Sequence, residues 1–327
     1  DERIHAREPV RFDFSTEYQR RFHEVHLPQI LERDYLVGAA VWSQFDFGSA
    51  GRHDSKPNIN QKGLLYYDRV PKDVWHYYRA RLLGEPVLHI ATRDWPLRAG
   101  SGPADAEQPI VVYSNLNAVE LLLDGASLGT RAVENGAARW TVRLARGMNR
   151  LVARGTGPEA RVRDETVVTY EDRPATIAVN AGSHYQYVDR SGVVWEADRP
   201  YVPGGWGYVG GEARLSHRRI AGSEEDGLYQ ATREGVEAYR FDVPDGEYEV
   251  RILVADTRAS GSAPRVMDVR VNGAPVFSGL DLVGRHGAHT AVERTVRVRA
   301  AEGTGIHVEL DARAGSTTLS GVAVRRR

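Results

Sequence analysis

Gly-Ala-Ala-Val-Trp-Ser-Gln-Phe-Asp-Phe at residues 38–47 is followed by Asn-Gln-Lys-Gly-Leu-Leu at 60–65 and by Asp-Arg-Val-Pro-Lys at 68–72. The apolar run from Tyr35 to Val41 has the length and the bounds of a strand that is buried on both faces. It ends on Trp42 and leads into a polar loop. The pattern therefore predicts a strand of a parallel sheet with a functional loop after it.

A helix is predicted directly after this loop. Pro71 suits the first helical position, because its missing N–H costs nothing there, and Gly84 is a helix stop. One broad apolar face lies between them, made of Val74, Trp75, Tyr77, Tyr78 and Leu82. Strand, loop and helix form one βα unit, and in a (β/α)₈ barrel the chemistry sits at the C-terminal ends of the strands. Trp42 and the loop after it are therefore predicted to be site residues.

These residues resemble the last strand and the last helix of the barrel in glycoside hydrolase family 2, which holds β-galactosidases, β-glucuronidases and β-mannosidases. Trp42, Asp46-Phe47, Lys62-Gly63 and the Asp-Arg-x-Pro-Lys text of residues 68–72 match the family in order and spacing. The resemblance implies that residues 1–83 are the C-terminal portion of a TIM-barrel catalytic domain.

Composition limits the possible functions. The chain has 327 residues, and its 43 Lys and Arg nearly balance its 44 Asp and Glu, for a net charge of −1. A length above ~250–300 residues predicts two or three domains. The charge balance argues against a nucleic-acid or membrane-surface protein. The absence of cysteine excludes disulfides and thiolate metal sites.

The first part of the chain holds too few elements to close a barrel. Ser15 is a predicted helix N-cap and Pro28 is predicted to kink or end that helix. Glu17 and Glu24 are expected on a solvated helix face. The resemblance implies a fragment that begins after the nucleophilic glutamate, with the acid/base glutamate further upstream, so no catalytic residue is expected here. We therefore expect the chain alone not to hydrolyse a glycoside.

Two β-sandwiches are predicted after Gly84. Residues 84–172 show short strands between turns, with Asp124-Gly125 as a hairpin signal, and resemble the immunoglobulin-like sandwich that follows the family 2 barrel. Residues 173–327 are expected to be a malectin-like carbohydrate-binding β-sandwich. That resemblance rests on texts such as Val179-Asn-Ala-Gly182 and Val271-Asn-Gly273. The predicted fold class is mostly β, with helix, strand and helix from a barrel end ahead of both sandwiches.

The candidate binding residues fall into two groups. The resemblance makes Trp42 a wall of the sugar subsite, and an indole offers a flat apolar face to sugar C–H groups. Asn60 and Lys62 match a β-glucuronidase motif that holds the sugar carboxylate, although galactosidase-like members carry it too, so Lys62 is alternatively a loop anchor. Asp46 is expected either to orient the loop or to be an ordinary loop carboxylate. Arg52, His53 and Asp54 are interpreted as a solvated loop.

In the last domain, exposed rings in the glycine-flanked stretch 203–208 could form a sugar platform or could merely cover the sandwich edge. Trp206, Tyr208 and Tyr229 are the predicted carbohydrate contacts. Malectin presents neighbouring aromatics after the strand that corresponds to the one ending near Ala255. Here Asp256-Thr-Arg-Ala-Ser260 stands instead, which puts the same sugar specificity in doubt.

The resemblance to family 2 implies that the chain is part of a retaining exo-β-glycosidase. β-Galactosidase is favoured, and the alternatives are a β-glucuronidase or galacturonidase that uses Asn60 and Lys62 for the carboxylate, or a non-catalytic carbohydrate-binding protein. The expected partners are an oligo- or polysaccharide glycan and the remainder of the barrel, together with a possible homo-oligomer, and neither nucleic acid nor membrane. No metal or other cofactor is expected. A periplasmic or secreted location is expected for such an enzyme.

Overall fold

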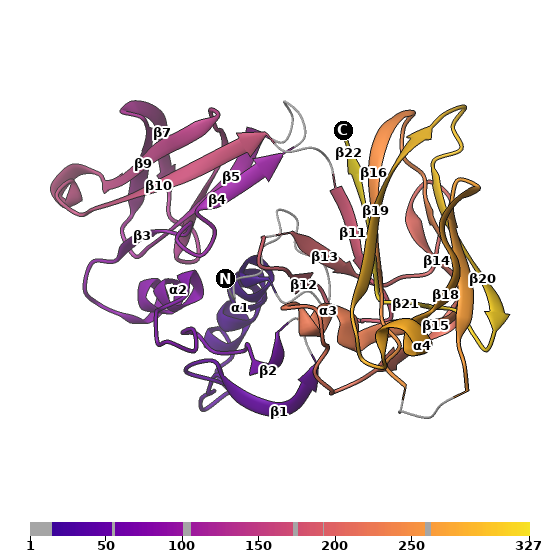
Figure 1. Cartoon of the computed structure of the whole chain (residues 1–327). Coiled ribbons are helices and arrows are strands. Elements are labelled where there is room, and N and C mark those ends of the chain that lie inside the picture. The colour runs from indigo at the N-terminus through magenta and orange to yellow at the C-terminus, as the bar shows by residue number, and fades with distance from the viewer. Residues whose placement is uncertain (1–14, 54–55, 101–105, 173–175, 192, 259–262) are drawn as a thin grey trace. The chain divides into compact units, whose positions relative to one another are not determined.

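The computed structural model describes residues 15–53, 56–100, 106–172, 176–191, 193–258 and 263–327 (Figure 1). The chain divides into two compact units. The N-terminal unit comprises the described parts of Arg3–Ala50 and Ile59–Arg173, and the C-terminal unit comprises those of Gly51–Asn58 and Pro174–Arg327. No helix in these described ranges is both long and apolar enough to cross a membrane.

Helix α1 (Thr16–Leu31) begins as the sequence predicts, because the Ser15 hydroxyl accepts the Tyr18 N–H at 3.0 Å. Pro28 lies inside the helix and does not end it, since three more helical residues follow. The prediction of a solvated face is wrong for both glutamates. Glu17 is buried, and Glu24 accepts the Tyr113 hydroxyl at 2.5 Å and the Arg139 guanidinium at 2.6 Å.

The strand predicted at Tyr35–Val41 is absent from the described sheets, which corrects that expectation. The run is solvent-exposed, with Tyr35 76% and Val37 108% accessible. A strand buried on both faces needs partners on either side, and no described strand pairs with this run. The apolar sequence is there, but the neighbours that would make it a strand are not among the described residues.

The polar loop after Trp42 contains a hairpin. Strands β1 (Phe47–His53) and β2 (Pro57–Asn60) form a two-stranded sheet. Helix α2 (Asp73–Leu82) follows, with Lys72 at its N-cap, so Pro71 stands one residue before the cap rather than at the first helical position. Val74 and Tyr77 are buried as predicted, whereas Leu82 is exposed.

Two sheets enclose the core of the immunoglobulin-like sandwich in the N-terminal unit. The three-stranded sheet has the order β3 (Leu88–Ile90), β5 (Glu107–Ser114) and β8 (Ala137–Arg143). The five-stranded sheet has the order β4 (Leu97–Gly100), β10 (Arg163–Asp172), β9 (Gly147–Gly155), β6 (Ala118–Leu123) and β7 (Ala126–Ala132). Alternate residues of β5 and β8 point inward, and Ile110, Val112 and Val142 are among the buried side chains. A short 3₁₀ helix, η2 (Gly157–Glu159), joins β9 to β10.

The C-terminal unit is a second sandwich of two larger sheets (Figure 1). One sheet runs β12 (Tyr187–Val188), β13 (Val194–Ala197), β11 (Thr176–Asn180), β22 (Gly321–Arg326), β16 (Gly246–Val254) and β19 (Val292–Ala300). The other runs β14 (Trp206–Leu215), β15 (Ala231–Phe241), β20 (Ile306–Ala314), β17 (Val266–Val271) and β18 (Ala274–Asp281), with β21 (Thr318–Leu319) on β15.

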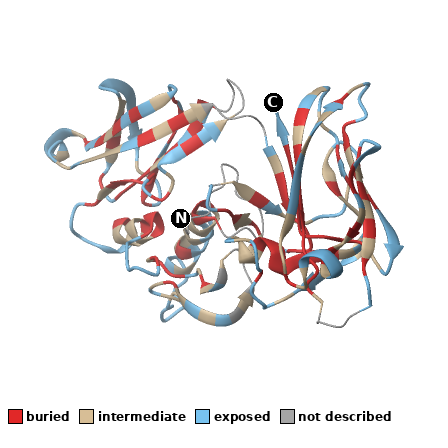
Figure 2. Cartoon of the chain, in the orientation of Figure 1, coloured by how far each residue is buried: buried red, intermediate tan, exposed pale blue. Residues whose placement is uncertain are grey.

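The core of the C-terminal unit lies between these sheets. Figure 2 shows buried residues along β11, β16 and β22, and the alternation in β16 places Tyr248, Val250 and Ile252 in one cluster with Val269 and Val308 of the facing sheet. Two short helices, α3 (Asp226–Gln230) and α4 (Leu282–His286), lie outside the sheets. The mostly β class with two sandwiches is confirmed, and the exact domain boundaries stay predictions.

Candidate functional site

Two chain segments lie side by side where the sequence predicts the sugar site. Residues 43–46 and 62–65 form an irregular parallel ladder: the Leu64 N–H donates to the Ser43 carbonyl at 3.1 Å and the Asp46 N–H donates to the Leu65 carbonyl at 2.9 Å. Phe45 and Leu65 form a bridge in the same ladder. This pairing fixes the distance between the chain after Trp42 and the chain that carries Lys62.

Asp46 is buried in this ladder and ties it to the start of helix α2. Its Oδ1 accepts the Lys72 ammonium at 2.8 Å and the Gly63 N–H at 2.8 Å. Asp46 is 3% exposed and Lys72 is 2% exposed. This geometry gives Asp46 the loop-orienting position that its sequence context suggested, and contact with substrate stays a prediction for this residue.

Trp42 is 71% exposed, the opposite of a packed core tryptophan. Phe47 packs edge-on to the indole, with ring centroids 6.1 Å apart and planes at 79°. The peptide bond between Trp42 and Ser43 is cis. A large apolar ring left open in this way can stack against the C–H face of a sugar.

Asn60 and Lys62 lie within two residues of each other at the end of β2. Asn60 is 5% exposed, and its Oδ1 accepts the Lys62 N–H at 3.1 Å. Lys62 is exposed, and no hydrogen bond or ion pair to its ammonium occurs among the described residues. The pair therefore presents a free cation beside a fixed amide, a combination that suits an anionic group.

The other polar residues of the loop give less information. Arg52 is half-buried, and the His53 side chain and Asp54 lie outside the described residues. Among the side chains that are described, no group of three or more His, Cys, Asp or Glu could hold a metal ion.

The rings predicted to bind glycan in the C-terminal unit are covered to different extents. The Arg199 guanidinium lies 3.8 Å from the centre of the Trp206 ring, and Phe241 stacks on the same indole at 6.5 Å. The Arg233 guanidinium lies 3.3 Å from the centre of the Tyr208 ring. One face of each ring is thus occupied by a cation, in a cation–π arrangement. Glycan binding by Trp206 and Tyr208 stays a prediction.

The expectation for Tyr229 has to be corrected. Its ring is 2% exposed and belongs to a core cluster with Trp195, Ile220 and Leu228. Its hydroxyl donates to Glu293 at 3.4 Å. Burial, together with the Glu293 charge, raises the pKa of Tyr229 well above its usual value, so the hydroxyl stays protonated. The buried ring has no face to offer to a sugar.

Charged side chains replace the aromatics that malectin carries after the strand corresponding to β16. The Arg258 guanidinium donates to both Asp256 oxygens, at 2.7 Å for the closer contact to Oδ2. Arg265, fully buried, lies 3.5 Å from Asp256 and 3.1 Å from Glu234. Burial alone would raise the pKa of Asp256, but the Arg258 hydrogen bonds and the Arg265 charge outweigh it and hold that pKa below its usual range.

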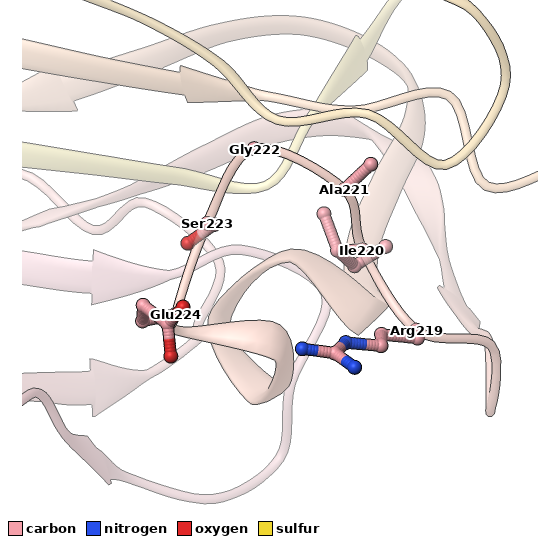
Figure 3. A pocket seen from close by; sticks show the side chains of 6 residues that line it. All are labelled: Arg219, Ile220, Ala221, Gly222, Ser223 and Glu224. Carbon is pink, nitrogen blue, oxygen red and sulfur yellow. The ribbon is translucent and has the colours of Figure 1, made fainter.

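Two open pockets occur in the described part of the C-terminal unit. One, of about 550 Å³, is bordered by residues 211–214 and by Glu234, Gly235 and Ser316, beside the Arg265 network. The other, of about 580 Å³, is lined by residues 219–224. Figure 3 shows that this loop turns back at Gly222, with Arg219 and Glu224 at its ends. Gly222 has φ +77°, which suits glycine at such a turn.

Sequence reasoning missed the residues that hold the loop. Lys72 was part of the Asp-Arg-Val-Pro-Lys match, but its burial against Asp46 has no signal in a single sequence. In the C-terminal unit, sequence reasoning also missed Asp198, which accepts the Arg233 guanidinium at 2.7 Å, the Gly182 N–H at 2.6 Å and the Tyr239 hydroxyl at 3.0 Å. In the sequence, Lys72 shows only as a lysine within a motif, and Asp198 only as an aspartate two residues before a proline.

The chain matches two family descriptions. The Malectin domain matches residues 175–319, and a domain of unknown function, DUF4982, matches residues 105–161. Among curated proteins, a β-glucuronidase of Bacteroides fragilis is 34% identical over 164 residues, 48% of this chain and 23% of that protein. The β-galactosidase BoGH2A of Bacteroides ovatus is 25% identical over 159 residues, 47% of this chain and 18% of that protein.

Solved structures of a β-glucuronidase resemble the chain over its whole length. One of them is the Bacteroides uniformis β-glucuronidase 2 covalently bound to cyclophellitol-6-carboxylate aziridine, with 34% identity and a TM-score of 0.71. The match covers 100% of this chain and 40% of that protein. The chain thus spans about a fifth to two fifths of the length of these relatives. Its residues 175–319 match the Malectin domain, and the chain resembles part of the β-glucuronidases and β-galactosidases of glycoside hydrolase family 2.

Proposed function

We propose that this chain is part of a β-glucuronidase, to which it contributes the sugar-subsite wall and the contact with the sugar carboxylate. The observation that carries the proposal is the 34% identity over the whole chain to a β-glucuronidase whose bound ligand bears a 6-carboxylate. The β-galactosidase that the sequence favoured has less support, since the galactosidase relative is 25% identical over about half of the chain.

The loop after β2 supports this choice of sugar. The Lys62 ammonium is without a described partner, and the neighbouring Asn60 is fixed through its bond to the Lys62 N–H. A glucuronide carries a carboxylate where a galactoside carries a neutral hydroxyl group. A free cation favours the charged group, because charge-assisted hydrogen bonds are roughly twice as strong as neutral ones.

The exposed apolar side chains of the N-terminal unit support the proposal that another part of the protein packs against it. Tyr35, Leu36 and Val37 are all exposed, as are Phe22 and Val25 of α1. Large exposed apolar patches mark interaction surfaces. We propose that the remainder of a catalytic barrel covers them and supplies the two glutamates expected of a retaining glycosidase, since we assign no catalytic residue to this chain.

The test is hydrolysis by the polypeptide encoded by the complete reading frame that contains this chain. We expect p-nitrophenyl β-D-glucuronide to be a better substrate than the β-galactoside. Lys62→Ala should lower kcat/KM for the glucuronide by about 10- to 100-fold, with a much smaller effect on any galactoside turnover, since a lost charged hydrogen bond costs ~1.5–3 kcal/mol.

Arg146→Ala is the matched control, because Arg146 is an exposed cation that makes no described ion pair and lies on the sandwich rather than in the loop. It should leave both substrates unaffected. A preference of the wild-type protein for galactoside, or equal losses for both substrates in Lys62→Ala, would refute carboxylate recognition.

The proposal extends to the role of the C-terminal unit and to the cellular location of the enzyme. We infer that the malectin domain is an accessory glycan-binding module and that the enzyme is periplasmic or secreted. Glycan-array binding by the whole protein, compared between wild type and Tyr208→Ala, tests the first inference. Cell fractionation followed by glucuronidase assay of each fraction tests the second.

A further inference from the structure

Lys72 occupies an unusual place for a lysine. It is 2% exposed, and its ammonium donates to the Asp46 carboxylate at 2.8 Å and to the Gln61 carbonyl at 3.0 Å. The ammonium also lies 5.1 Å from the centre of the Tyr66 ring. Lysine is almost never fully buried unless it is paired, so this ammonium is held by specific contacts rather than left by chance in the interior.

The Lys72 ammonium is connected to both sequence neighbours of Lys62. Gln61 is bound directly through its carbonyl, and Gly63 is bound through Asp46, whose Oδ1 accepts the Gly63 N–H at 2.8 Å. Gln19 adds a third anchor, since its Nε2 donates to the Gly63 carbonyl at 2.9 Å. Both peptide neighbours of Lys62 are therefore fixed, while its own ammonium has no described partner.

The backbone at Gly63 leaves no room for this arrangement to relax. A Cβ at this residue would stand 2.2 Å from the Phe45 carbonyl carbon and from the Asp46 nitrogen. The two segments of the ladder thus touch backbone to backbone. A displacement of Asp46 is passed directly to Gly63, and from there to the lysine next to it.

We propose that Lys72 and Asp46 are positioning residues for carboxylate recognition: their buried ion pair sets the place from which Lys62 meets the anionic sugar group. The inference rests on the proposed function, which it deepens. Lys72 is too buried to touch the substrate, so it acts through the loop. Buried ion pairs are weak sources of stability and are best explained where they specify one conformation.

Lys72→Met and Asp46→Asn in the whole enzyme test this proposal. Methionine keeps the chain length without the charge, and asparagine keeps an acceptor for the Gly63 N–H. We expect KM for p-nitrophenyl β-D-glucuronide to rise about 10-fold or more while kcat changes less, and the glucuronide-to-galactoside preference to fall. Arg146→Met is the control, because Arg146 is an exposed cation that makes no described ion pair and lies on the sandwich rather than in the ladder.

A second measurement needs no substrate. Hydrogen exchange at the Gly63 and Leu64 amides should become faster in both variants than in wild type and in Arg146→Met. If the wild-type enzyme does not hydrolyse glucuronides, the proposed function is wrong. The hydrogen-exchange result still decides whether the Lys72–Asp46 ion pair holds the loop. Unchanged exchange, or equal kinetic losses on both substrates, would overturn the inference. If Lys72→Met does not fold, the same two measurements on Asp46→Asn decide the question.

Discussion

The candidate sugar-binding rings of the two units differ in how far protein side chains cover them. In the N-terminal unit Trp42 is 71% exposed, and its one described ring contact is with Phe47. In the C-terminal unit, Trp206 and Tyr208 each carry a guanidinium on one face, and Tyr229 is buried. The number of rings in a stretch therefore says little about sugar binding, since what matters is whether a face is free of protein contacts.

Two buried acids, Asp256 in the C-terminal unit and Asp94 in the N-terminal unit, differ in the direction of their pKa shifts. In the C-terminal unit the pKa of Asp256 is lowered, because its arginine partners outweigh burial. In the N-terminal unit burial and the neighbouring Asp73 charge raise the pKa of Asp94 to about 7. The first arrangement is a charged network, and the second is a pair of carboxyl groups that holds the start of α2 and resists ionisation.

The largest expected effect concerns the network that covers Tyr208. Asp198→Ala should lower the free energy of unfolding by ~3–5 kcal/mol, because it leaves the Arg233 guanidinium buried without its carboxylate. Chemical denaturation of the whole protein measures this. Asp242→Ala is the control, since Asp242 also binds a tyrosine hydroxyl, that of Tyr201, but is exposed. Equal losses of unfolding free energy in the two variants would contradict the expected difference between a buried and an exposed carboxylate.

A smaller effect is expected when the exposed Trp42 is compared with the covered Trp206. Trp42→Ala should lower kcat/KM for the aryl glycoside by about 10- to 100-fold, because the ring contributes apolar contact worth ~1.5–3 kcal/mol to the bound sugar. Trp206→Ala should leave hydrolysis unchanged and lower only stability. Steady-state kinetics and thermal unfolding of both variants make the comparison. A similar kinetic loss in both would mean that exposure does not identify the subsite wall.

The smallest effect is a difference in pH dependence. Asp94 has a raised folded pKa, so its stabilising contribution is complete below its unfolded pKa of ~3.9 and is lost as pH rises through about 7. Between pH 5 and 7 this should cost about 1–2 kcal/mol of unfolding free energy, and Asp94→Asn should flatten the profile. Asp256 has a lowered pKa, so its contribution is present above ~3.9 and is lost on acidification below that value.

Unfolding curves measured from pH 3 to pH 8 check both signs. Asp256→Asn should flatten only the acidic limb, and Asp94→Asn only the limb above pH 5. If both variants flattened the same limb, the two acids would not differ in the way that their surroundings indicate.

Much of the fold was predictable because its signals are local. Alternation in residues 246–254 and turn texts such as Asn272-Gly273 place β16 and the β17–β18 hairpin within a residue or two. The N-cap at Ser15 is equally local. Strand β7 gives no such local signal, because its residues are all exposed. Strand β14 gives only a weak one, because glycines interrupt its pattern and a register shift lies between Val209 and Gly210.

The candidate site was predictable only in part. Trp42, Asn60 and Lys62 could be proposed as site residues because they belong to a motif, and their contact with a sugar stays a prediction. The burial of Tyr229, the guanidinium over Tyr208 and the Lys72–Asp46 pair depend on residues far apart in the chain, which no local pattern connects. The strand expected at Tyr35–Val41 failed for the same reason, since a strand exists only through its neighbours.

Gly63 has a consequence for redesign of sugar preference. Because any Cβ there would meet the Phe45 and Asp46 backbone at 2.2 Å, a mutant library that varies residue 63 will consist mostly of broken loops. Diversity is better placed at residues 60 and 62, whose side chains can change while the glycine keeps the two segments in register. If the proposed function holds, changes of substrate preference are best sought at these two residues, which precede a fixed backbone contact.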